Sequence, residues 1–378
     1  MKKILFITNL AKNVGSFSIG CIMAAHTNDL EFHLAANWQG KSAKELQEDE
    51  KKYDIKEIHI DLSRTPYSLN NIKAFKQLID YIKKEKIDFI HCNTPVGGIL
   101  GRLVGEKCNV KKIIYQVHGF HFYKGAPLKN WLIYYPIEKW LAKKTDVIIT
   151  INKEDYKRAK NFKLKKDGKI YYVPGVGIDL SRYTKNQTSR QLKRKELELK
   201  ETDVAIFSVG ELNKNKNNKV IIEAIARLKE TNIHYFLCGK GPLEPKLKKL
   251  VKKKNLEKRI HFLGYRTDVD ELLHAADIFV MPSFREGLSR SIMEAMACGL
   301  PCLISNIRGN SDLIQEDIGG YLLDPNDIDG FAYAIEKCIR QPELRRKMKN
   351  NNINKIKDFS IDIVVDKLID IYKNELVK

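Results

Sequence analysis

The chain has 378 residues, which at roughly 150 residues per domain indicates two domains. Its 43% apolar and 30% charged residues form a globular composition, and this excludes the disordered and fibrous classes. The net charge of +20 at pH 7 requires an explanation. Nucleic acid, an anionic membrane surface and phosphorylated substrates are candidate partners, and a lysine-rich surface is the plain alternative.

The N-terminal segment MKKILFITNL has two lysines followed by an apolar run, as a signal peptide does. The run is short, Thr8 and Asn9 interrupt it, and no small-residue cleavage site follows, so we interpret it as a buried first strand. No apolar stretch approaches the roughly 20 residues that cross a bilayer. The seven cysteines are scattered without a C-x-x-C pair, and we expect them to be reduced and mostly buried in a cytoplasmic protein.

Short apolar runs alternate with amphipathic stretches along the first half of the chain. The predicted strands are 3–8, 31–36, 55–62, 89–93, 112–118, 147–151 and 169–174. Helical patterns lie between most of them, over 69–84, 98–106 and 153–161. This alternation predicts a parallel sheet covered by helices on both faces.

The alternation lapses between about 175 and 203, where two glycines precede the charged run RQLKRKELELKETD. It then resumes, with predicted strands over 204–210, 234–239, 260–265, 278–283, 301–305 and 320–323. The helical patterns here are 218–229, 243–254, 269–276, 289–298, 327–340 and the stretch from 342 to the end. We therefore expect an α/β protein of two Rossmann-like domains facing across a cleft, with ligands beyond the carboxyl ends of the strands.

The expected domains are an N-terminal domain over 1–177 and a C-terminal domain over 203–355. The C-terminal helix over 356–378 is a candidate for packing back on the N-terminal domain.

The most informative segment, from 283 to 301, reads SFREGLSRSIMEAMACGLP. A strand ends before it, Ser289 or Ser291 is placed to cap the next helix, and Gly299 is placed to end that helix in a left-handed conformation. A helix N-terminus after a strand favours an anion such as a diphosphate. Glu286 and Glu294 offer acceptors for sugar or ribose hydroxyls.

This segment resembles the signature of retaining GT-B glycosyltransferases, specifically glycosyltransferase family 4, in which two glutamates are separated by seven residues. The stretch from Ala275 to Phe284, the Phe-Leu-Gly at 262–264, and Val209-Gly210 followed by Lys216 are similar to the family as well. The resemblance is strong over about 204–323 and looser across the N-terminal half.

The resemblance implies a nucleotide-sugar donor, expected to be a UDP-sugar, with no other cofactor. It implies that the C-terminal domain over 203–355 binds this nucleotide-sugar and that the N-terminal domain over 1–177 binds the acceptor. It implies that Glu294 binds the ribose, and that Glu286 with the amides of Gly287, Leu288 and Ser289 positions the donor sugar and phosphate. Lys216 matches the family's cation at the diphosphate, where it would neutralise the leaving group.

One position departs from the family pattern, because Glu211 stands where members usually have an arginine after Val-Gly. A carboxylate does not neutralise a diphosphate. Either another cation, such as Lys214, Arg285 or Arg290, takes that place, or the loop is arranged differently.

The N-terminal half offers His118, which follows a predicted strand and precedes Gly119. It resembles the family's cleft histidine, which contacts the donor sugar near the acceptor, while His121 and His91 match less well. Gly15 partly matches the paired glycines that approach the donor phosphate after the first strand. The segment 93–98 follows another strand and is a candidate for the acceptor side.

Asp268-Val-Asp270 has the form of a D-x-D metal motif, but we interpret it as the cap of the helix that begins near 269. The family generally needs no metal, and we expect none here.

The segment 122–144 interleaves aromatic residues with lysines, and Pro136 is expected to kink or restart its helix. Interfacial helices have this chemistry, with aromatic rings at headgroup level and lysines against anionic lipid. A core helix with an exposed lysine face is the alternative, and the sequence leaves both open.

The sequence thus predicts a retaining transferase that moves a sugar from a UDP-sugar to an undecaprenyl-diphosphate-linked saccharide in capsule, exopolysaccharide or O-antigen synthesis. It is expected to be cytoplasmic and peripheral at the inner face of the cell membrane. One alternative is another GT-B enzyme, a nucleotide-sugar epimerase or a sugar phosphorylase. The other is a basic nucleic-acid-binding protein, but no nucleic-acid-binding module is present, and we expect no nucleic-acid partner.

Overall fold

The computed structural model describes residues 1–183 and 187–378, which divide into two compact units. The first unit comprises Met1–Gly177 and the C-terminal Ile361–Lys378, and the second unit is Ile178–Ser360. The chain therefore passes between the units at two neighbouring points, where the amide of Ile178 donates to the carbonyl of Phe359 at 3.1 Å. Each unit is described below by itself.

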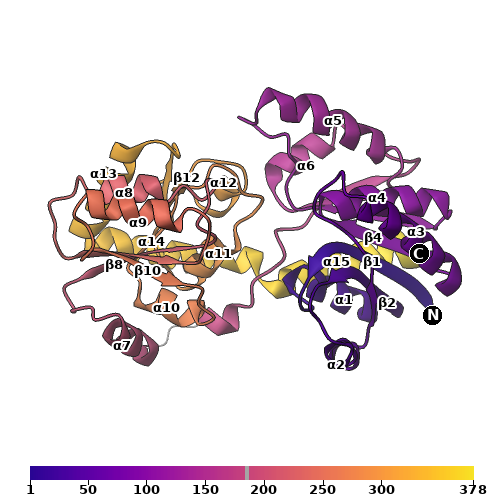
Figure 1. Cartoon of the computed structure of the whole chain (residues 1–378), viewed down its shortest axis with the longest axis horizontal. Helices are drawn as coiled ribbons and strands as arrows, with labels where there is room; N and C mark the ends of the chain where they lie inside the picture. The colour runs from indigo at the N-terminus through magenta and orange to yellow at the C-terminus, as the bar shows by residue number, and fades with distance from the viewer. Residues whose placement is uncertain (184–186) are drawn as a thin grey trace. The chain divides into compact units, whose positions relative to one another are not determined.

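The first unit is built on a parallel sheet in the order β3-β2-β1-β4-β5-β6-β7. Its strands are β1 (Lys2–Ala11), β2 (Leu30–Trp38), β3 (Lys56–His59), β4 (Phe89–Asn93), β5 (Lys112–Val117), β6 (Val147–Thr150) and β7 (Lys169–Tyr172). The helices are α1 (Ser16–Thr27), α2 (Ala43–Tyr53), α3 (Asn70–Glu85), α4 (Pro95–Lys107), α5 (Leu128–Ala142) and α6 (Lys153–Ala159). Figure 1 shows these helices on both sides of the sheet.

The second unit repeats this architecture with a parallel sheet in the order β10-β9-β8-β11-β12-β13. Its strands are β8 (Val204–Val209), β9 (Ile233–Cys238), β10 (Ile260–Gly264), β11 (Ile278–Met281), β12 (Cys302–Ser305) and β13 (Gly320–Leu323). The helices are η1 (Leu180–Tyr183), α7 (Gln187–Glu196), α8 (Lys219–Ile225), α9 (Glu244–Lys253), α10 (Val269–Ala275), α11 (Arg290–Ala297), α12 (Asn310–Leu313), α13 (Ile328–Arg340), α14 (Pro342–Lys355) and η2 (Ile356–Phe359).

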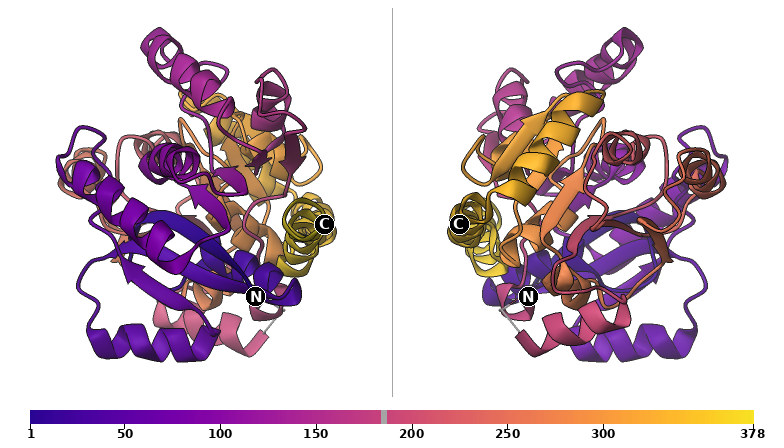
Figure 2. Two further views of the ribbon diagram at one scale, coloured as in Figure 1. Left: turned by 90° about the vertical axis from the view of Figure 1, so that its right-hand side faces the viewer. Right: turned by 90° about the vertical axis from the view of Figure 1, so that its left-hand side faces the viewer.

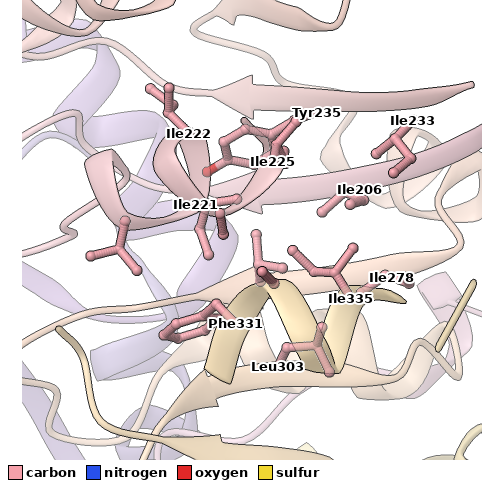
Figure 3. Close-up of a cluster of buried hydrophobic side chains, with 14 of the residues drawn as sticks. Ile206, Ile221, Ile222, Ile225, Ile233, Tyr235, Ile278, Leu303, Phe331 and Ile335 are labelled. Atoms are coloured by element: carbon pink, nitrogen blue, oxygen red, sulfur yellow. The ribbon is translucent and has the colours of Figure 1, made fainter. Parts of the chain in front are cut away.

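The central strands are continuous apolar runs because helices bury both of their faces. One face of the second sheet packs its Ile206 and Ile278 against α8 and α13, and Phe331 and Ile335 of α13 close this core (Figure 3). A second cluster on the opposite face of that sheet includes Phe207 and Met293. The strands and helices predicted from alternation are therefore confirmed, with ends that shift by a few residues.

The C-terminal helix α15 (Ile361–Tyr372) packs in the first unit against α1. A Cβ on Gly20 of α1 would lie 3.3 Å from the side chain of Leu368, so the small residue permits this close approach. The following π-helical turn, Lys373–Val377, brings the backbone carbonyl of Leu376 to 3.1 Å from the amine of Lys2. The two ends of the chain are accordingly close together in Figures 1 and 2.

The charged run that the sequence placed at the domain boundary is folded into the second unit. Part of it forms α7, and the guanidinium of Arg194 is buried there, donating to the carbonyls of Ala275, Lys200 and Asp203. Arg194 also pairs with Asp277 at 3.2 Å. These buried partners make the run part of the second unit, which begins at Ile178.

Helix α5 is continuous through Pro136, so the helix does not restart there as the sequence analysis allowed. A proline inside a helix removes the hydrogen bond to the carbonyl four residues earlier, here Leu132. Both residues are exposed, so water can satisfy that carbonyl.

All seven cysteines are free thiols, five of them buried. Within 1–183 and 187–378, no helix combines the length and apolar character that spanning a membrane requires.

Candidate active site

The second sheet reverses its strand order between β8 and β11, and the loops that follow these strands meet at its carboxyl edge. Such a switch point is where open α/β sheets bind ligands. A small pocket opens there. Its lining residues are Ser208, Val209, Gly210, Lys216, Asn218, Val280 and Met281.

Lys216 and Glu286 form an ion pair at this edge, with Nζ 2.8 Å from Oε1. Lys216 belongs to the loop after β8, and its amide donates to Oδ1 of Asn213 at 3.1 Å. Glu286 belongs to the loop after β11. Both side chains are largely but not fully buried, at 20% and 13% exposure, so a ligand can reach the pair.

Two hydrogen bonds join the loops that carry this pair. The amide of Phe284 donates to the carbonyl of Asn215 at 2.9 Å, and the Asn215 side chain donates to the carbonyl of Arg285 at 2.9 Å. The separation between Lys216 and Glu286 is therefore set by the backbone as well as by their charges.

Arg308 holds the Glu286 loop in place through its guanidinium. This buried arginine follows β12, and its Nε and one terminal nitrogen each lie 3.2 Å from the carbonyl oxygen of Glu286. Next to it, Gly309 has φ of +81°, and a Cβ there would lie 2.0 Å from the carbonyl oxygen of Gly287. A glycine is needed at position 309 for both reasons.

The backbone amides of Gly287, Leu288 and Ser289 donate no hydrogen bond to another group in the described part of the chain. Ser289 occupies the N-cap of α11, but its hydroxyl donates to the sulfur of Met281 at 3.3 Å and does not cap the helix. This corrects the expected serine cap at Ser289, and leaves the first N–H groups open to an anion. Gly299 does end the helix with φ of +75°.

Glu294 lies on α11 with its carboxylate 13% exposed, 2.9 Å from Nε of Arg290. The side chain of Tyr183 also hydrogen-bonds Glu294, and burial together with this carboxylate raises the pKa of the tyrosine. Arg290 is half exposed. Glu294 is thus held by two partners in the second turn of the helix and is not a solvated residue.

Glu211, the departure from the family pattern, is exposed and accepts a hydrogen bond from the Asn213 side chain at 3.0 Å. It therefore orders the β8 loop around Asn213, which in turn receives the amide of Lys216. Lys214 and Arg285, two of the candidate replacement cations, are exposed on the two loops.

His118 and Gly15 lie in the first unit, at the carboxyl ends of β5 and β1 respectively, and Gly15 is the N-cap of α1. Both ring nitrogens of His118 are buried without a hydrogen-bond partner. Burial lowers the pKa of this histidine to about 4. His118 is therefore neutral at neutral pH.

Asp268 of the D-x-D segment stands at the N-cap position of α10, but its carboxylate pairs with Arg266 and Lys193 and caps nothing. These cations hold the pKa of Asp268 well below its usual range. Among the described residues, no group of three or more His, Cys, Asp or Glu side chains is arranged to hold a metal ion.

The second unit thus brings Lys216 to Glu286 and Arg290 to Glu294, and Gly287, Leu288 and Ser289 lie between these two pairs in the chain. Sequence reasoning missed Arg308 and Tyr183. The only available signal for Arg308 was its place in an Arg-Gly pair after a strand, since carboxyl-edge loops collect functional residues.

Two family models match the chain. The model described as glycosyl transferases group 1 matches residues 189–355, and the model described as glycosyl transferase 4-like matches residues 3–152. The chain is 35% identical to a Bacillus subtilis (strain 168) protein named "Putative glycosyltransferase EpsD", over 98% of this chain and 96% of that protein.

The chain is also 33% identical to an Escherichia coli protein named UDP-Gal:alpha-D-GlcNAc-diphosphoundecaprenol alpha-1,3-galactosyltransferase, over 81% of this chain and 83% of that protein. The crystal structure of Anabaena HepE in complex with UDP and glucose has the same fold, with a TM-score of 0.80 at 18% identity, covering 99% of this chain and 100% of that one.

Two Rossmann-like units with a polar site at the carboxyl edge of the second sheet define the GT-B architecture. The chain belongs to the glycosyltransferases of this fold, and it is an enzyme of that class.

Proposed function

We propose that this protein is a retaining enzyme of glycosyltransferase family 4. It moves a sugar from a UDP-sugar to an undecaprenyl-diphosphate-linked saccharide, in the synthesis of a bacterial surface polysaccharide such as a capsule. The Lys216–Glu286 pair at the switch point of the second sheet carries this proposal, because it joins a cation for a diphosphate to a carboxylate for a sugar hydroxyl.

The donor diphosphate is placed against the free amides of Gly287, Leu288 and Ser289, which begin α11. There it competes with Glu286 for the amine of Lys216. Once a phosphate oxygen pairs with the amine of Lys216, the Glu286 carboxylate is free to accept hydrogen bonds from the sugar. The lysine then offsets the charge that develops on the leaving diphosphate.

Glu294 is placed to accept the ribose hydroxyls, in exchange for its bonds to Arg290 and Tyr183. Arg290, released from the carboxylate, faces the same helix N-terminus and can pair with phosphate oxygens. Together with Lys216 it supplies the cations that the family pattern places near position 211.

Retention follows if the acceptor hydroxyl attacks on the face from which the diphosphate leaves, with a phosphate oxygen taking the proton. A hydrolase-like double displacement needs two carboxylates flanking the bond, one of them a nucleophile. Glu286 is paired with a lysine, an arrangement suited to positioning. We therefore assign it no covalent role.

The proposed acceptor class rests on the Escherichia coli relative, whose name specifies a diphosphoundecaprenol-linked sugar. A lipid-linked acceptor requires the enzyme to work at the inner face of the cell membrane. In this proposal the second unit binds most of the donor, and the first unit binds the acceptor. Gly15 and His118, at the carboxyl edge of the first sheet, contact the donor phosphate and the donor sugar respectively.

Helix α5 of the first unit supplies a surface suited to that membrane. Its inner face is anchored by Arg102 of α4, which is fully buried and holds Glu138 through two hydrogen bonds of 2.7 and 3.2 Å. Its outer face exposes large apolar side chains. They are Leu128, Leu132, Ile133, Tyr134, Ile137 and Trp140.

Exposed lysines lie on the same side of the helix, with Lys129 and Lys139 among these residues and Lys143 just beyond the helix end. Apolar and aromatic groups mixed with cations fit the headgroup region of an anionic bilayer. We assign the outer face of α5 to membrane binding. Its lysines then account for part of the net charge of +20.

Vesicle sedimentation tests this assignment. The protein is expected to bind vesicles containing phosphatidylglycerol more strongly than vesicles of phosphatidylcholine alone. The triple variant Leu132→Ser, Ile133→Ser and Ile137→Ser should lose binding, whereas Tyr333→Ser, which removes an exposed aromatic ring from the second unit, should not. Equal binding by the triple variant would reject α5 as the docking surface.

A donor screen tests the proposed reaction. UDP-, GDP- and ADP-sugars are incubated with the protein and a membrane extract, and sugar incorporated into lipid is measured. We expect incorporation from a UDP-sugar. Steady release of a free product without a lipid acceptor would instead indicate an epimerase or a phosphorylase. Salt-sensitive nucleic-acid binding without UDP binding would refute the enzyme assignment altogether.

A further inference from the structure

A cavity of about 900 Å³ lies in the second unit, away from the candidate active site. Its lining includes Asp277, which directly precedes β11, and Pro301, which directly precedes β12. These are the amino ends of parallel strands, so the cavity lies at the edge of the sheet opposite the loops of Lys216 and Glu286. Its volume is in the range of small-molecule sites, about 300–1,000 Å³.

The lining of this cavity is strongly cationic. Six of its residues are lysines or arginines, and two, Glu201 and Asp277, are carboxylates. Cations exceed carboxylates threefold here, whereas the whole chain has 67 basic and 47 acidic residues. The excess is therefore a local feature and not only a general surface composition. Helix α7 supplies Arg190, Arg194 and Lys195, and helix α14 supplies Arg345, Arg346 and Lys349.

The two arginines of α7 share one carboxylate. Nη2 of Arg190 lies 2.7 Å from Oδ1 of Asp277, and Nη1 of Arg194 lies 3.2 Å from Oδ2 of the same residue. The other hydrogen bonds of these guanidinium groups go to backbone carbonyls. A carbonyl satisfies a donor but carries no net charge, so one positive charge of the pair remains uncompensated.

Arg345 of α14 is also held by backbone carbonyls. Its Nη1 donates to the carbonyl of Cys338 and, at 3.0 Å, to that of Ile339, both in the last turn of α13. Within residues 1–183 and 187–378 it forms no ion pair. A helix C-terminus carries roughly half a negative charge, which offsets only part of the charge of a guanidinium.

The exposed cations of the cavity are available to a ligand. The amine of Lys195 has no hydrogen bond or ion pair among the described residues. Arg346 lies 2.8 Å from Glu343 on its own helix, with both side chains 74% exposed, and such a surface pair stabilises little. The two lining carboxylates oppose an anion weakly, because Asp277 is shared by two arginines and Glu201 is exposed.

These cations select a ligand with more than one negative charge. Guanidinium groups match phosphate oxygens in pairs, and here the backbone already fixes several of them in position. The uncompensated charges come from two helices on the walls of one cavity. A ligand with a chain of phosphate groups can meet both walls, whereas a single phosphate meets fewer of these charges.

We propose that this cavity, between α7 and α14, binds a small molecule that carries a chain of phosphate groups, as a nucleoside triphosphate or inorganic triphosphate does. The site is separate from the donor site of the proposed glycosyltransfer and does not depend on that function.

Calorimetric titration tests the site with two probes, sodium tripolyphosphate and ATP. Each is added to the Lys216→Ala variant, which lacks the cation of the candidate active site. We expect either probe to bind at one site per chain, with saturating UDP leaving this binding unchanged, and inorganic phosphate to bind at least about tenfold more weakly. Equal affinities would identify the phosphate chain as the recognised group, and tighter binding of ATP would add its nucleoside; either result supports the site. Displacement of tripolyphosphate by UDP would place the probe in the donor site and overturn the proposal.

Two double variants locate the binding. Lys195→Gln with Arg346→Gln removes two exposed charges of the cavity and leaves the carbonyl contacts of the other arginines intact. The control, Lys252→Gln with Lys253→Gln, removes two exposed charges from α9 of the same unit. We expect the first pair to weaken tripolyphosphate binding at least about tenfold and the second pair to leave it unchanged. Equal affinities in the two variants would mean that the overall charge attracts the probe and that the cavity does not bind it.

Lysine acetylation tests the site in the wild-type protein. Acetic anhydride modification is followed at each lysine by peptide mass spectrometry. We expect tripolyphosphate to slow the acetylation of Lys195 and to leave that of Lys252 unchanged. An unchanged rate at Lys195 would refute the site.

An acidic polysaccharide is the alternative ligand for a cationic surface, and heparin is its probe. Binding of heparin without binding of tripolyphosphate or ATP would overturn the assignment to a small molecule. None of these measurements needs turnover. Absence of sugar transfer would therefore refute the proposed function and leave this site supported, whereas failure of both probes to bind would refute the site alone.

Discussion

Nζ of Lys216 lies 2.8 Å from Oε1 of Glu286, although the two residues are 70 positions apart in the chain. Their loops follow adjacent strands, β8 and β11, and are joined by hydrogen bonds between backbone and side-chain groups. A cation and a carboxylate are thereby held ready at the place where a charged donor would bind.

Replacing either member should greatly reduce sugar transfer. Lys216→Ala removes the charge that stabilises the leaving diphosphate, and we expect kcat to fall about 10²- to 10³-fold. Glu286→Gln keeps the shape but weakens hydrogen bonding to the sugar. Lys248→Ala, which breaks an exposed pair with Glu244, is the control and should leave the rate unchanged. Wild-type rates in both site variants would show that the site lies elsewhere.

Gly309→Ala should damage the donor site more than a comparable glycine elsewhere. Its Cβ would overlap the carbonyl of Gly287 and push the loop that carries Glu286. Gly40→Ala is a matched control, because Gly40 has φ of +75° but no atom within 4 Å of the added Cβ. We expect both to lose about 1 kcal/mol of stability from backbone strain, and only Gly309→Ala to weaken UDP binding in calorimetry. Similar UDP affinities in the two variants would contradict this account of the loop.

Breaking the buried pair beneath α5 should be costly. Arg102 is fully buried, and its guanidinium also lies 3.8 Å from the ring centroid of Tyr115. Removal of its partner by Glu138→Ala leaves a buried charge unpaired, and we expect a loss of about 3–5 kcal/mol in urea denaturation. The exposed pair of Arg346 and Glu343 serves for comparison, and Glu343→Ala should cost less than about 1 kcal/mol. Equal losses would mean that the Arg102 pair contributes no more than a surface one.

The first unit should lose stability as the solution is acidified. Burial lowers the pKa of His91 to about 3 and that of His118 to about 4, both below the ordinary value of 6.5. The unfolded chain therefore binds more protons than the folded chain between these values. Stability from the neutral histidines is fully present above about pH 6.5 and falls as the pH drops towards 4 and then 3.

Denaturation midpoints measured across this range should decline accordingly, and His91→Gln should decline less steeply, because it removes one of the two groups while keeping a polar side chain. A variant that matches the wild-type pH profile would show that His91 does not contribute.

Much of the fold was predictable because alternating strands and helices leave a periodic pattern of apolar residues. Parallel strands buried on both faces read as short apolar runs, and nearly all of them begin and end within a few residues of their predicted positions. The exceptions are segments whose local pattern is outweighed by contacts with residues distant in the chain. The charged run around Arg194 interrupts the alternation and indicates a domain boundary, yet backbone carbonyls and Asp277 accept hydrogen bonds from Arg194 within the second unit.

Candidate residues such as Glu286 and Glu294 were recognisable because their spacing and the glycines around them form a local motif. Arg308 and Tyr183 carry no such signal, since each acts through a residue distant in sequence. Glu211 was visible as a departure, but its bond to Asn213 was not.

The sequence by itself determined the periodicity, the family signature and the positions of the strand ends, because these depend on neighbours in the chain. The tertiary structure alone decided that Lys216 faces Glu286, that Arg308 holds the Glu286 loop, and that the ring nitrogens of His118 are buried without a hydrogen-bond partner. Those outcomes depend on which loops the sheet order brings together, and on which polar groups then find a partner.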